Sequence, residues 1–442
     1  MDNARLRVAV IGLWHLGCVA AACLAKLGHA VVGVETSPRR LEELRAGRAP
    51  LREPGLDELL TAGLAAGTLR FSGDLEEAVR EADVGYIAYD TPVNSEDEAD
   101  PSIVREAAQR VGNGLPSGAL LLVQSQVPVG SCELIRAALE AARPGQVLVA
   151  CVPENIRLGQ AIERYLTPDM LVVGARDGAA YETVDRVFAR VDAPRVRTDF
   201  ATAETIKHAI NAFLATSISY VNEMANLAQL EGVDLDALLA ALRLERRVGP
   251  HVPLTPGMGF AGGTLARDIK ALQALGGRHG YVPHLFDAVL RVNDDQKTLP
   301  VRWLQQAYGA LEGRRVGVLG LTYKVGTSTL RRSGAVEVIR RLVASGAAVA
   351  AADPQADPTE IADLPPFEFS RDPYLAAAGA DALVVVTPWP QFEALDYARI
   401  LSEMRHPFVL DMARMLDRRR LEALGFAYIG VGTGPVPRTA AP

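Results

Sequence analysis

The chain has 442 residues, more than one ordinary hydrophobic core organises, and this length predicts two or three domains. Hydrophobic residues make up 49% and charged residues 22%, a balance that excludes a disordered or fibrous protein. The formal net charge of −7 provides no basic surface for nucleic acid, so an acidic ligand would need a local group of cations.

The apolar runs and the cysteines indicate in which cell compartment we expect the protein and whether we expect a metal site. No apolar run reaches membrane-spanning length, and the first residues lack the apolar segment and cleavage site of a signal peptide. The four cysteines are Cys18, Cys23, Cys132 and Cys151, and they show no metal-ligand spacing. We therefore expect a reduced, cytoplasmic chain with no metal site, no membrane partner and no nucleic-acid partner.

The first segments follow the pattern of a dinucleotide-binding unit. A buried-strand pattern at Leu6–Ile11 leads into a glycine turn and a helical segment, and a second apolar strand, Ala30–Val34, ends at Glu35. In such a unit, backbone amides at the turn hold a pyrophosphate, and the acid binds the adenosine ribose. The pattern predicts NAD binding through Gly12, Gly17 and Glu35, although a Rossmann-like domain that binds nothing stays an alternative here.

Later segments continue the alternation and then interrupt it. Strands are predicted at Val84–Ala88, Ala119–Val123 and Gln146–Val152, between helical segments, which is typical of a doubly wound parallel sheet. Residues 203–232 keep helical spacing without proline and predict one long helix. A second alternating unit starts at Arg314. The order is therefore α/β, then helical, then α/β.

Short motifs follow one another in a specific order along the chain. They are DTPVNSEDEAD (90–100), SQVPVG (125–130), VPENIRLGQAI (152–162), EXXKHXXNAFLA (204–215), SYVNE (219–223), RVGP (247–250), PGMGFAGG (256–263), LGLTYK (319–324) and TPWPQF (387–392). Together they resemble the UDP-glucose/GDP-mannose 6-dehydrogenase family along essentially the whole chain.

The resemblance implies a fold, a domain division and a reaction. The implied α/β fold has two Rossmann-like doubly wound domains bridged by a long central helix. Residues 1–200 would bind NAD, residues 201–300 would form a homodimer, and residues 301–442 would bind the nucleotide of the sugar. Family members oxidise the sugar C6 alcohol to a carboxylate in two hydride transfers, and a cysteine thiolate captures the intermediate aldehyde as a thiohemiacetal.

Four catalytic residues are implied by the family motifs. Lys207 would steady the developing oxyanion, and Asn211, four residues later on the same helix face, would hold a water or the sugar. Asp268 would hydrogen-bond a catalytic water, and Glu154 would act as a general acid or base.

Binding residues carry over in the same way. The resemblance assigns to the cofactor Gly12, Trp14, Gly17, Glu35, Arg40, Thr91, Gln126 and Arg331. It assigns to the substrate Arg247, Gly259, Phe260, Lys324 and Arg414, with Arg247 lent to the neighbouring subunit. The cations would supply the local positive charge that a diphosphate needs. An ordinary surface role stays open for Arg414, because DMAR fits the family's DGRN loosely.

The nucleophile segment departs from the family pattern. The family reads GFGGSCxxKD and this chain reads GFAGGTLARD, so Thr264 occupies the position of the nucleophilic cysteine. A thiol is partly ionised near neutrality, whereas a threonine hydroxyl needs a dedicated base and carries a crowding methyl group. A thiohemiacetal is therefore impossible at this position, which stays a candidate catalytic residue with altered chemistry.

Further departures fall in the same predicted sites. Gln126 replaces a threonine, Leu158 replaces a glutamate, Asn155 replaces an aromatic residue, and Arg267 keeps the charge of a lysine but not its shape. Trp14 stands where GxGxxG has its middle glycine, so its side chain must point away, reshape the loop or occupy phosphate space. The loop TSTLRRSG keeps Arg331 but lacks the acids of the family's TDDxRESP.

Three functions are compatible with these residues. The first is an NAD-dependent nucleotide-sugar oxidoreductase that performs one hydride transfer without a thiohemiacetal. The second is a complete four-electron 6-dehydrogenase in which water, set by Asn211 and Asp268, replaces the cysteine. The third is a non-catalytic paralogue that binds a sugar nucleotide. We place the first ahead of the others; the sugar and its base are left open.

Overall fold

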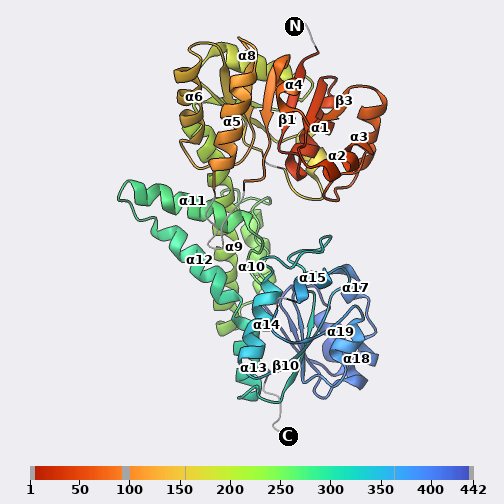
Figure 1. The fold of residues 1–442 in the computed structure, drawn as a ribbon. Helices are drawn as coiled ribbons and strands as arrows, with labels where there is room; N and C mark the ends of the chain where they lie inside the picture. The colour runs from red at the N-terminus through yellow and green to blue at the C-terminus, as the bar shows by residue number, and fades with distance from the viewer. Residues whose placement is uncertain (1–4, 92–99, 155, 363, 438–442) are drawn as a thin grey trace. The chain divides into compact units, whose positions relative to one another are not determined.

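The computed structural model describes residues 5–91, 100–154, 156–362 and 364–437 (Figure 1). The chain divides into two compact units, residues 1–210 and 211–442, and the boundary lies inside helix α9 (Phe200–Glu231). Each unit has its own parallel-rich sheet and its own apolar cores. The two Rossmann-like sheets and the long helix confirm the predicted fold class, while the division at residues 200 and 300 stays a prediction.

The first unit contains a sheet with the strand order β3-β2-β1-β4-β5-β6-β7-β8 among the described residues. The strands are β1 (Arg7–Ile11), β2 (Ala30–Val34), β3 (Leu69–Ser72), β4 (Val84–Ile87), β5 (Leu120–Val123), β6 (Leu148–Cys151), β7 (Leu171–Ala175) and β8 (Arg195–Thr198). Neighbouring strands are parallel except β6 and β7, which pair antiparallel. This pair is a departure from the all-parallel sheet that the alternation predicts.

Helices cover both faces of this sheet. They are α1 (His15–Lys26), α2 (Pro38–Arg45), α3 (Leu56–Ala65), α4 (Leu75–Arg80), α5 (Ser102–Gly114), α6 (Ser131–Ala142), α7 (Ala161–Leu166) and α8 (Gly178–Val187). Val8 and Val10 of β1 belong to the core that includes α1, α3, α7 and α8, whereas Ala9 and Ile11 belong to the core that includes α4, α5 and α6. This alternation is the period-two pattern of a strand buried on both faces.

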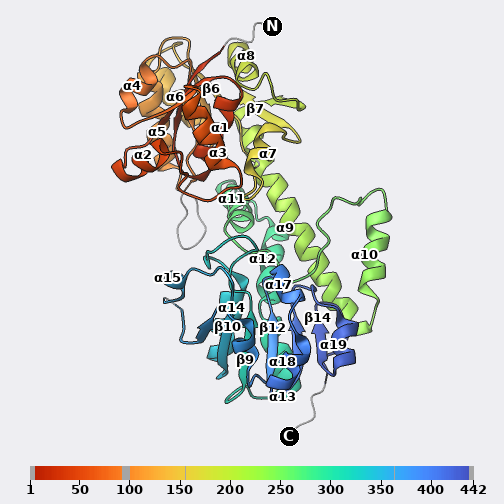
Figure 2. The same ribbon diagram turned by 90° about the vertical axis from the view of Figure 1, so that its right-hand side faces the viewer.

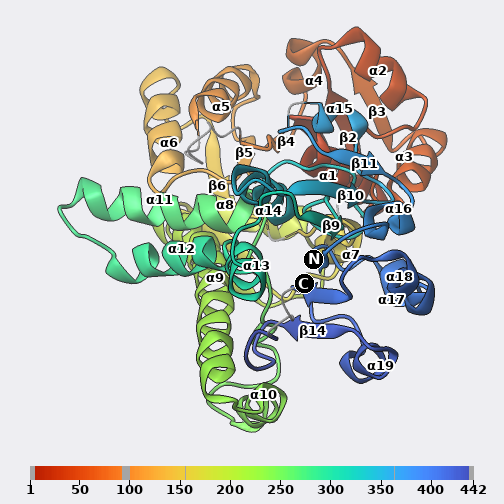
Figure 3. The ribbon, with the colours of Figure 1, turned by 90° about the horizontal axis from the view of Figure 1, so that it is seen from below.

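The predicted long helix is α9, which spans 32 residues and ends before Gly232, a glycine with φ of 68°. Asp234 then caps α10 (Leu235–Leu244) by accepting a hydrogen bond from the amide of Ala237. The remaining helices of this region are α11 (Thr264–Arg278), α12 (His284–Gln296) and α13 (Leu299–Tyr308). Figure 3 shows α11 and α12 as a helical pair that projects from α9. None of the described helices is both long and apolar enough to cross a membrane.

The second sheet, in the second unit, repeats the order of the first six strands, as β11-β10-β9-β12-β13-β14. The strands are β9 (Arg315–Leu319), β10 (Ala348–Ala352), β11 (Glu368–Ser370), β12 (Ala382–Val385), β13 (Phe408–Asp411) and β14 (Ala427–Gly430), all in parallel pairs. Its helices are α14 (Gly334–Ala344), α15 (Pro358–Ile361), α16 (Pro373–Ala377), α17 (Pro390–Glu393), α18 (Tyr397–Glu403) and α19 (Arg418–Leu424). Val384 packs in the core formed with α13 and α14, and Leu383 packs in the core formed with α16 to α19. Figure 2 shows the strands of this sheet among its helices.

Candidate functional site

The glycine turn after β1 can accommodate only glycine at two positions. Gly12 has a φ of 96°, and a Cβ atom there would lie 2.8 Å from the backbone nitrogen of Tyr89. A Cβ atom on Gly17 would lie 2.2 Å from the carbonyl oxygen of Gly12. Helix α1 begins directly after this turn without a side-chain cap, so its first-turn amides have no helical acceptor. This arrangement fits the pyrophosphate of a dinucleotide.

Glu35 follows β2 at the same edge of the first sheet. Its Oε1 atom accepts a hydrogen bond of 2.8 Å from the amide of Ser37, and its Oε2 atom lies 3.6 Å from Nη1 of Arg40. Carboxylate oxygens have several lone-pair sites, so Glu35 keeps the capacity to accept the ribose hydroxyls. The structure thus brings together Glu35 and Arg40, two of the residues assigned to the cofactor.

Trp14 lies beside these two residues. It precedes α1, its amide donates a hydrogen bond of 2.9 Å to the carbonyl of Gly12, and the residue is exposed. The Cζ atom of Arg40 lies 5.7 Å from the centre of the indole ring, a cation–π distance. The side chain therefore points toward the β2 side of the turn, where Glu35 is located.

Thr91 and Gln126 also meet at this edge, after β4 and β5. The hydroxyl of Thr91 donates a hydrogen bond of 2.5 Å to the backbone carbonyl of Gln126. Residues 92–99, which carry most of the DTPVNSEDEAD motif, and Asn155 lie outside the described residues. The roles of Thr91 and Gln126 toward the cofactor stay predictions.

A buried pair that the sequence did not reveal connects the glycine turn to a second loop. His15 Nε2 lies 2.9 Å from Glu53 Oε2. The same carboxylate accepts hydrogen bonds from the amides of Gly159 and Ala161, at 2.8 and 2.9 Å. Glu53 thereby ties the start of α1 to the loop that carries the VPENIRLGQAI motif. No local sequence pattern around Glu53 predicts its contacts with His15, Gly159 and Ala161, which become visible only in the tertiary structure.

The buried Lys207 and the partly buried Glu154 form a second pair in the first unit. Glu154 Oε1 lies 3.8 Å from Lys207 Nζ, and Glu154 Oε2 accepts a hydrogen bond of 2.6 Å from the amide of Ile156. A cavity of about 30 Å³ touches both side chains and Arg164, which leaves room for a water molecule. An acid and a base beside water can exchange protons with a reacting group.

Asn211 and Asp268 form a pair in the second unit. The Asn211 side-chain amide donates a short hydrogen bond to Asp268 Oδ2, and Asp268 is fully buried. Arg267 Nε lies 3.7 Å from the other carboxylate oxygen, so this arginine keeps a positive charge beside Asp268. Since Lys207 and Asn211 are one turn apart on α9, the helix presents both on one face.

Thr264 is the first residue of α11 and is exposed. Within the described part of the chain, its hydroxyl has no hydrogen-bond partner that could act as a base. A threonine hydroxyl without a base is a poor nucleophile at neutral pH. The position that carries the family's nucleophile is thus available to a ligand but not chemically activated.

The loop before Thr264 is held by amide side chains that the sequence did not single out. Asn293 Oδ1 accepts a hydrogen bond of 2.7 Å from the amide of Phe260, and its Nδ2 donates one of 3.2 Å to the carbonyl of the same residue. Gly259 has a φ of 83°, and a Cβ atom there would lie 2.3 Å from Asn293 Oδ1. Asn222 Oδ1 accepts a hydrogen bond of 2.8 Å from the amide of Gly257. Side-chain amides therefore hold Gly259 and Phe260 in place, and the substrate role of these two residues stays a prediction.

The two arginines that follow the loop after β9 differ in placement. Arg331 is exposed, whereas Arg332 has a φ of 57°, and its backbone carbonyl accepts a hydrogen bond of 3.1 Å from the amide of Gly262. Arg332 therefore contacts the glycine loop before Thr264, and the cofactor role of Arg331 stays a prediction. Lys324 is half-buried, and its Nζ lies 5.7 Å from the centre of the Tyr323 ring.

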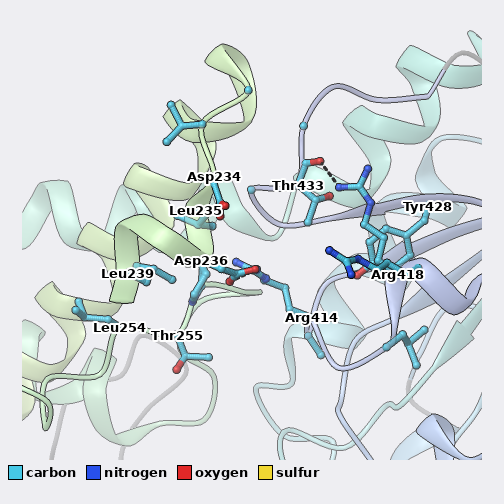
Figure 4. Close-up of a pocket in the computed structure, with 18 of the residues that line it drawn as sticks. Asp234, Leu235, Asp236, Leu239, Leu254, Thr255, Arg414, Arg418, Tyr428 and Thr433 are labelled. Atoms are coloured by element: carbon cyan, nitrogen blue, oxygen red, sulfur yellow. Dashed lines mark hydrogen bonds and ion pairs between the residues drawn. The ribbon is translucent and has the colours of Figure 1, made fainter. Parts of the chain in front are cut away.

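An arginine-lined pocket opens at the carboxyl ends of β13 and β14, with a volume of about 760 Å³ (Figure 4). Its charged lining residues are Arg243, Arg414, Arg418, Arg419, Asp234 and Asp236. Arg414 has a φ of 52°, and its Nη2 donates a hydrogen bond of 2.6 Å to Asp236. Arg418 Nη1 donates one of 3.0 Å to the carbonyl of Thr433. The four arginines outnumber the two aspartates, and this excess of positive charge favours an anionic ligand.

Arg247 lies outside this pocket lining. Its side chain is exposed, and its Nε donates a hydrogen bond of 2.9 Å to Glu245, two residues earlier. Among the described residues, Glu245 provides the side chain that holds this exposed arginine, and the role of Arg247 toward a second subunit stays a prediction.

Comparison with known proteins decides the family. The NAD-binding domain of the UDP-glucose/GDP-mannose dehydrogenase family matches residues 6–192, its central domain matches residues 201–295, and its UDP-binding domain matches residues 317–418. The chain belongs to the UDP-glucose/GDP-mannose dehydrogenase family. It is thus an NAD-dependent nucleotide-sugar dehydrogenase, as the motifs predict.

Individual members of the family are similar over almost their full length. The chain is 34% identical over 435 residues to a UDP-glucose 6-dehydrogenase of Rhizobium meliloti, which covers 97% of this chain and 99% of the relative. It is 35% identical to one of Pseudomonas aeruginosa, with 97% of each chain covered. A UDP-glucose dehydrogenase structure from Pyrobaculum islandicum superposes with a TM-score of 0.87 at 36% identity, over 98% of each chain.

No cysteine of this family member is available to replace the nucleophile. All four are buried in the first unit. Burial raises the pKa of the Cys18 and Cys23 thiols to about 12, which keeps them protonated at neutral pH. A hydrogen bond with Cys151, together with burial, raises the pKa of the Cys132 thiol well above its ordinary value.

Proposed function

We propose that the protein catalyses a single NAD-dependent hydride transfer from an alcohol carbon of a nucleotide sugar, without a covalent enzyme intermediate. The observation that carries this proposal is the state of Thr264. It is exposed and has no hydrogen-bonded base among the residues that the structure describes, whereas the neighbouring Asn211–Asp268 pair is intact and buried. The groups for alcohol oxidation are present, and the group for covalent capture is missing.

The chemistry of this step balances without a nucleophile. The alcohol loses a hydride from carbon and a proton from oxygen, and a carbonyl product results. NAD, when bound, accepts the hydride. Lys207 stabilises the alkoxide that develops as the proton leaves, and Glu154, whose Oε1 atom lies 3.8 Å from Lys207 Nζ, accepts that proton. Asn211 and Asp268 orient the substrate hydroxyl or a water molecule.

We propose UDP-glucose as the first substrate to test. The relatives from Rhizobium meliloti and Pseudomonas aeruginosa are named UDP-glucose 6-dehydrogenases. The arginine-lined pocket supports a nucleoside diphosphate, because its guanidinium groups can pair with phosphate oxygens and its 760 Å³ suit a ligand of this size.

We also propose that the protein forms a homodimer through α9. Phe213, Tyr220 and Leu227 follow one another at intervals of seven residues, and all three are exposed. Residues spaced by seven lie on one helix face, and Leu230 extends the stripe. A second α9 would bury this stripe. Replacing Leu227 by glutamate should shift the mass measured by light scattering from dimer to monomer, and an unchanged mass would contradict this interface. A cytoplasmic location stays a prediction.

Incubation with NAD and a panel of UDP-, GDP- and TDP-sugars tests the proposed reaction. Reduced cofactor is followed by absorbance, and the sugar nucleotide is followed by mass spectrometry. The expected product is lighter than the substrate by two hydrogens. A uronate would show that water replaces the cysteine, and no reduced cofactor with any sugar would favour a binding protein.

A further inference from the structure

Trp14 differs from the other two tryptophans of the chain. Trp303 and Trp389 are 3% and 4% exposed, whereas Trp14 is 43% exposed. Trp303 and Trp389 each pack in an apolar core of the second unit. An exposed aromatic ring forgoes the hydrophobic stabilisation that burial would give. An exposed indole in the dinucleotide turn therefore invites an explanation other than packing.

The contacts of Trp14 place the indole on the adenosine side of the turn. Arg40 is shared between two groups, since its guanidinium lies 5.7 Å from the indole centre and 3.6 Å from Glu35 Oε2. In a dinucleotide site, the acid after the second strand binds the adenosine ribose. The adenine attached to that ribose must therefore lie near Glu35, within reach of the face formed by Trp14 and Arg40.

We propose that Trp14 is a cofactor-binding residue that stacks on the adenine of NAD, with Arg40 fixing the indole in place. This inference rests on NAD as the cofactor and adds a binding role for the residue that replaces the middle glycine. Aromatic side chains stack on nucleobases through their flat faces, and the guanidinium restricts the motion of the ring. The turn thereby gains an adenine contact that a glycine cannot provide.

Intrinsic fluorescence provides a direct readout, because a solvent-exposed indole emits at longer wavelength than the two buried tryptophans, so the long-wavelength emission reports Trp14. The protein is titrated with NAD, with ADP-ribose and with nicotinamide mononucleotide. ADP-ribose is NAD without the nicotinamide ring, and nicotinamide mononucleotide lacks the adenosine. Trp14 emission should be quenched by NAD and ADP-ribose, and nicotinamide mononucleotide should leave it unchanged. These titrations contain no sugar nucleotide, so their outcome is independent of the reaction proposed above.

Variants then separate stacking from obstruction. Trp14→Gly should weaken ADP-ribose binding by about tenfold, while Trp14→Phe should retain most of the affinity. Arg40→Gln should weaken it less, and Arg39→Gln is the matched control, since Arg39 is exposed and pairs with Glu43. Unchanged melting temperatures would show that the variants fold. Equal or tighter binding by Trp14→Gly, or no quenching by ADP-ribose, would overturn the proposal.

Discussion

The two sheets share the order of six strands and the geometry of the first turn, but the acidic residue after the second strand of each has different partners. In the first sheet, Gly12 with a φ of 96° follows β1 and Glu35 follows β2. In the second sheet, Gly320 with a φ of 88° follows β9 and Asp353 follows β10. A Cβ atom at either glycine would clash with the backbone after the next strand in the sheet, at 2.8 and 2.6 Å.

Asp353 is fully buried, and its carboxylate is saturated by the protein itself. Its donors are the amides of Leu321, Thr322, Gln355 and Ala356, the hydroxyl of Thr322 and the indole of Trp389. Glu35 has one amide donor and one distant guanidinium among the described residues. In the same topology, Glu35 of the first sheet therefore keeps acceptor sites for a ligand. Asp353 of the second sheet uses its acceptor sites to stabilise the fold. Fold alone does not decide which sheet binds the dinucleotide.

The largest expected effect concerns the proposed reaction, to which Lys207 of the first unit contributes. Lys207→Ala should lower kcat by about 10³-fold, because the alkoxide loses its stabilising cation. NAD affinity should stay within about twofold. Lys297→Ala is the matched control, since that lysine pairs with the exposed Asp294 at 2.7 Å. Full turnover by Lys207→Ala would remove this lysine from the reaction.

Stability should depend on the acid of the second sheet. Asp353→Ala leaves several buried donors without an acceptor and should lower the free energy of unfolding by about 3 kcal/mol. Thermal unfolding measures this loss, with Asp372→Ala as a control that removes only an exposed helix cap. NAD affinity of the folded variant should be unchanged. If the free energy of unfolding fell no more than in the control, Asp353 would not have this stabilising role.

NAD binding should depend on Glu35, the acid that follows β2 in the first sheet. Glu35→Ala should weaken NAD binding by about tenfold and improve NADP binding, because the ribose hydroxyls lose an acceptor and the 2′-phosphate loses a repulsive charge. Calorimetric titration with both cofactors measures this change. Glu42→Ala on the exposed side of α2 serves as the control. An unchanged preference would place the adenosine elsewhere.

The smallest effect is a pH dependence confined to the first sheet. Burial lowers the pKa of His29, whose Nδ1 accepts a hydrogen bond from the amide of Leu6 and whose Nε2 lies 2.8 Å from the carbonyl of Val187. The neutral ring thus stabilises the folded state above the ordinary pKa of 6.5, and this contribution is lost as the pH falls through the lowered pKa.

Replacing His29 by glutamine should therefore flatten the decline of the melting temperature below pH 6.5. Ala347 occupies the corresponding position before β10, so the second sheet has no matching titration. A decline as steep as that of the original protein would show that other groups cause it.

Local patterns were sufficient to predict the strand–turn–helix unit around Gly12, the acid Glu35 and the length of α9. These features depend on residues close together in the sequence, such as a glycine turn between apolar strands. The antiparallel pairing of β7 depends on which edge is free after β6, and no local residue signals it. Saturation of Asp353 joins segments 31 to 36 residues apart. Such contacts become visible only in the tertiary structure.

The number of NAD molecules reduced per nucleotide sugar tests the central claim most directly. The original protein and Thr264→Cys are compared in limiting sugar nucleotide, with Thr264→Ser as the control that adds no thiol. We expect a ratio of one, with a carbonyl product, for the original protein and for the serine variant, and a ratio approaching two, with a uronate, for the cysteine variant. A ratio of two for the original protein would contradict the claim that the missing thiol limits oxidation to one step.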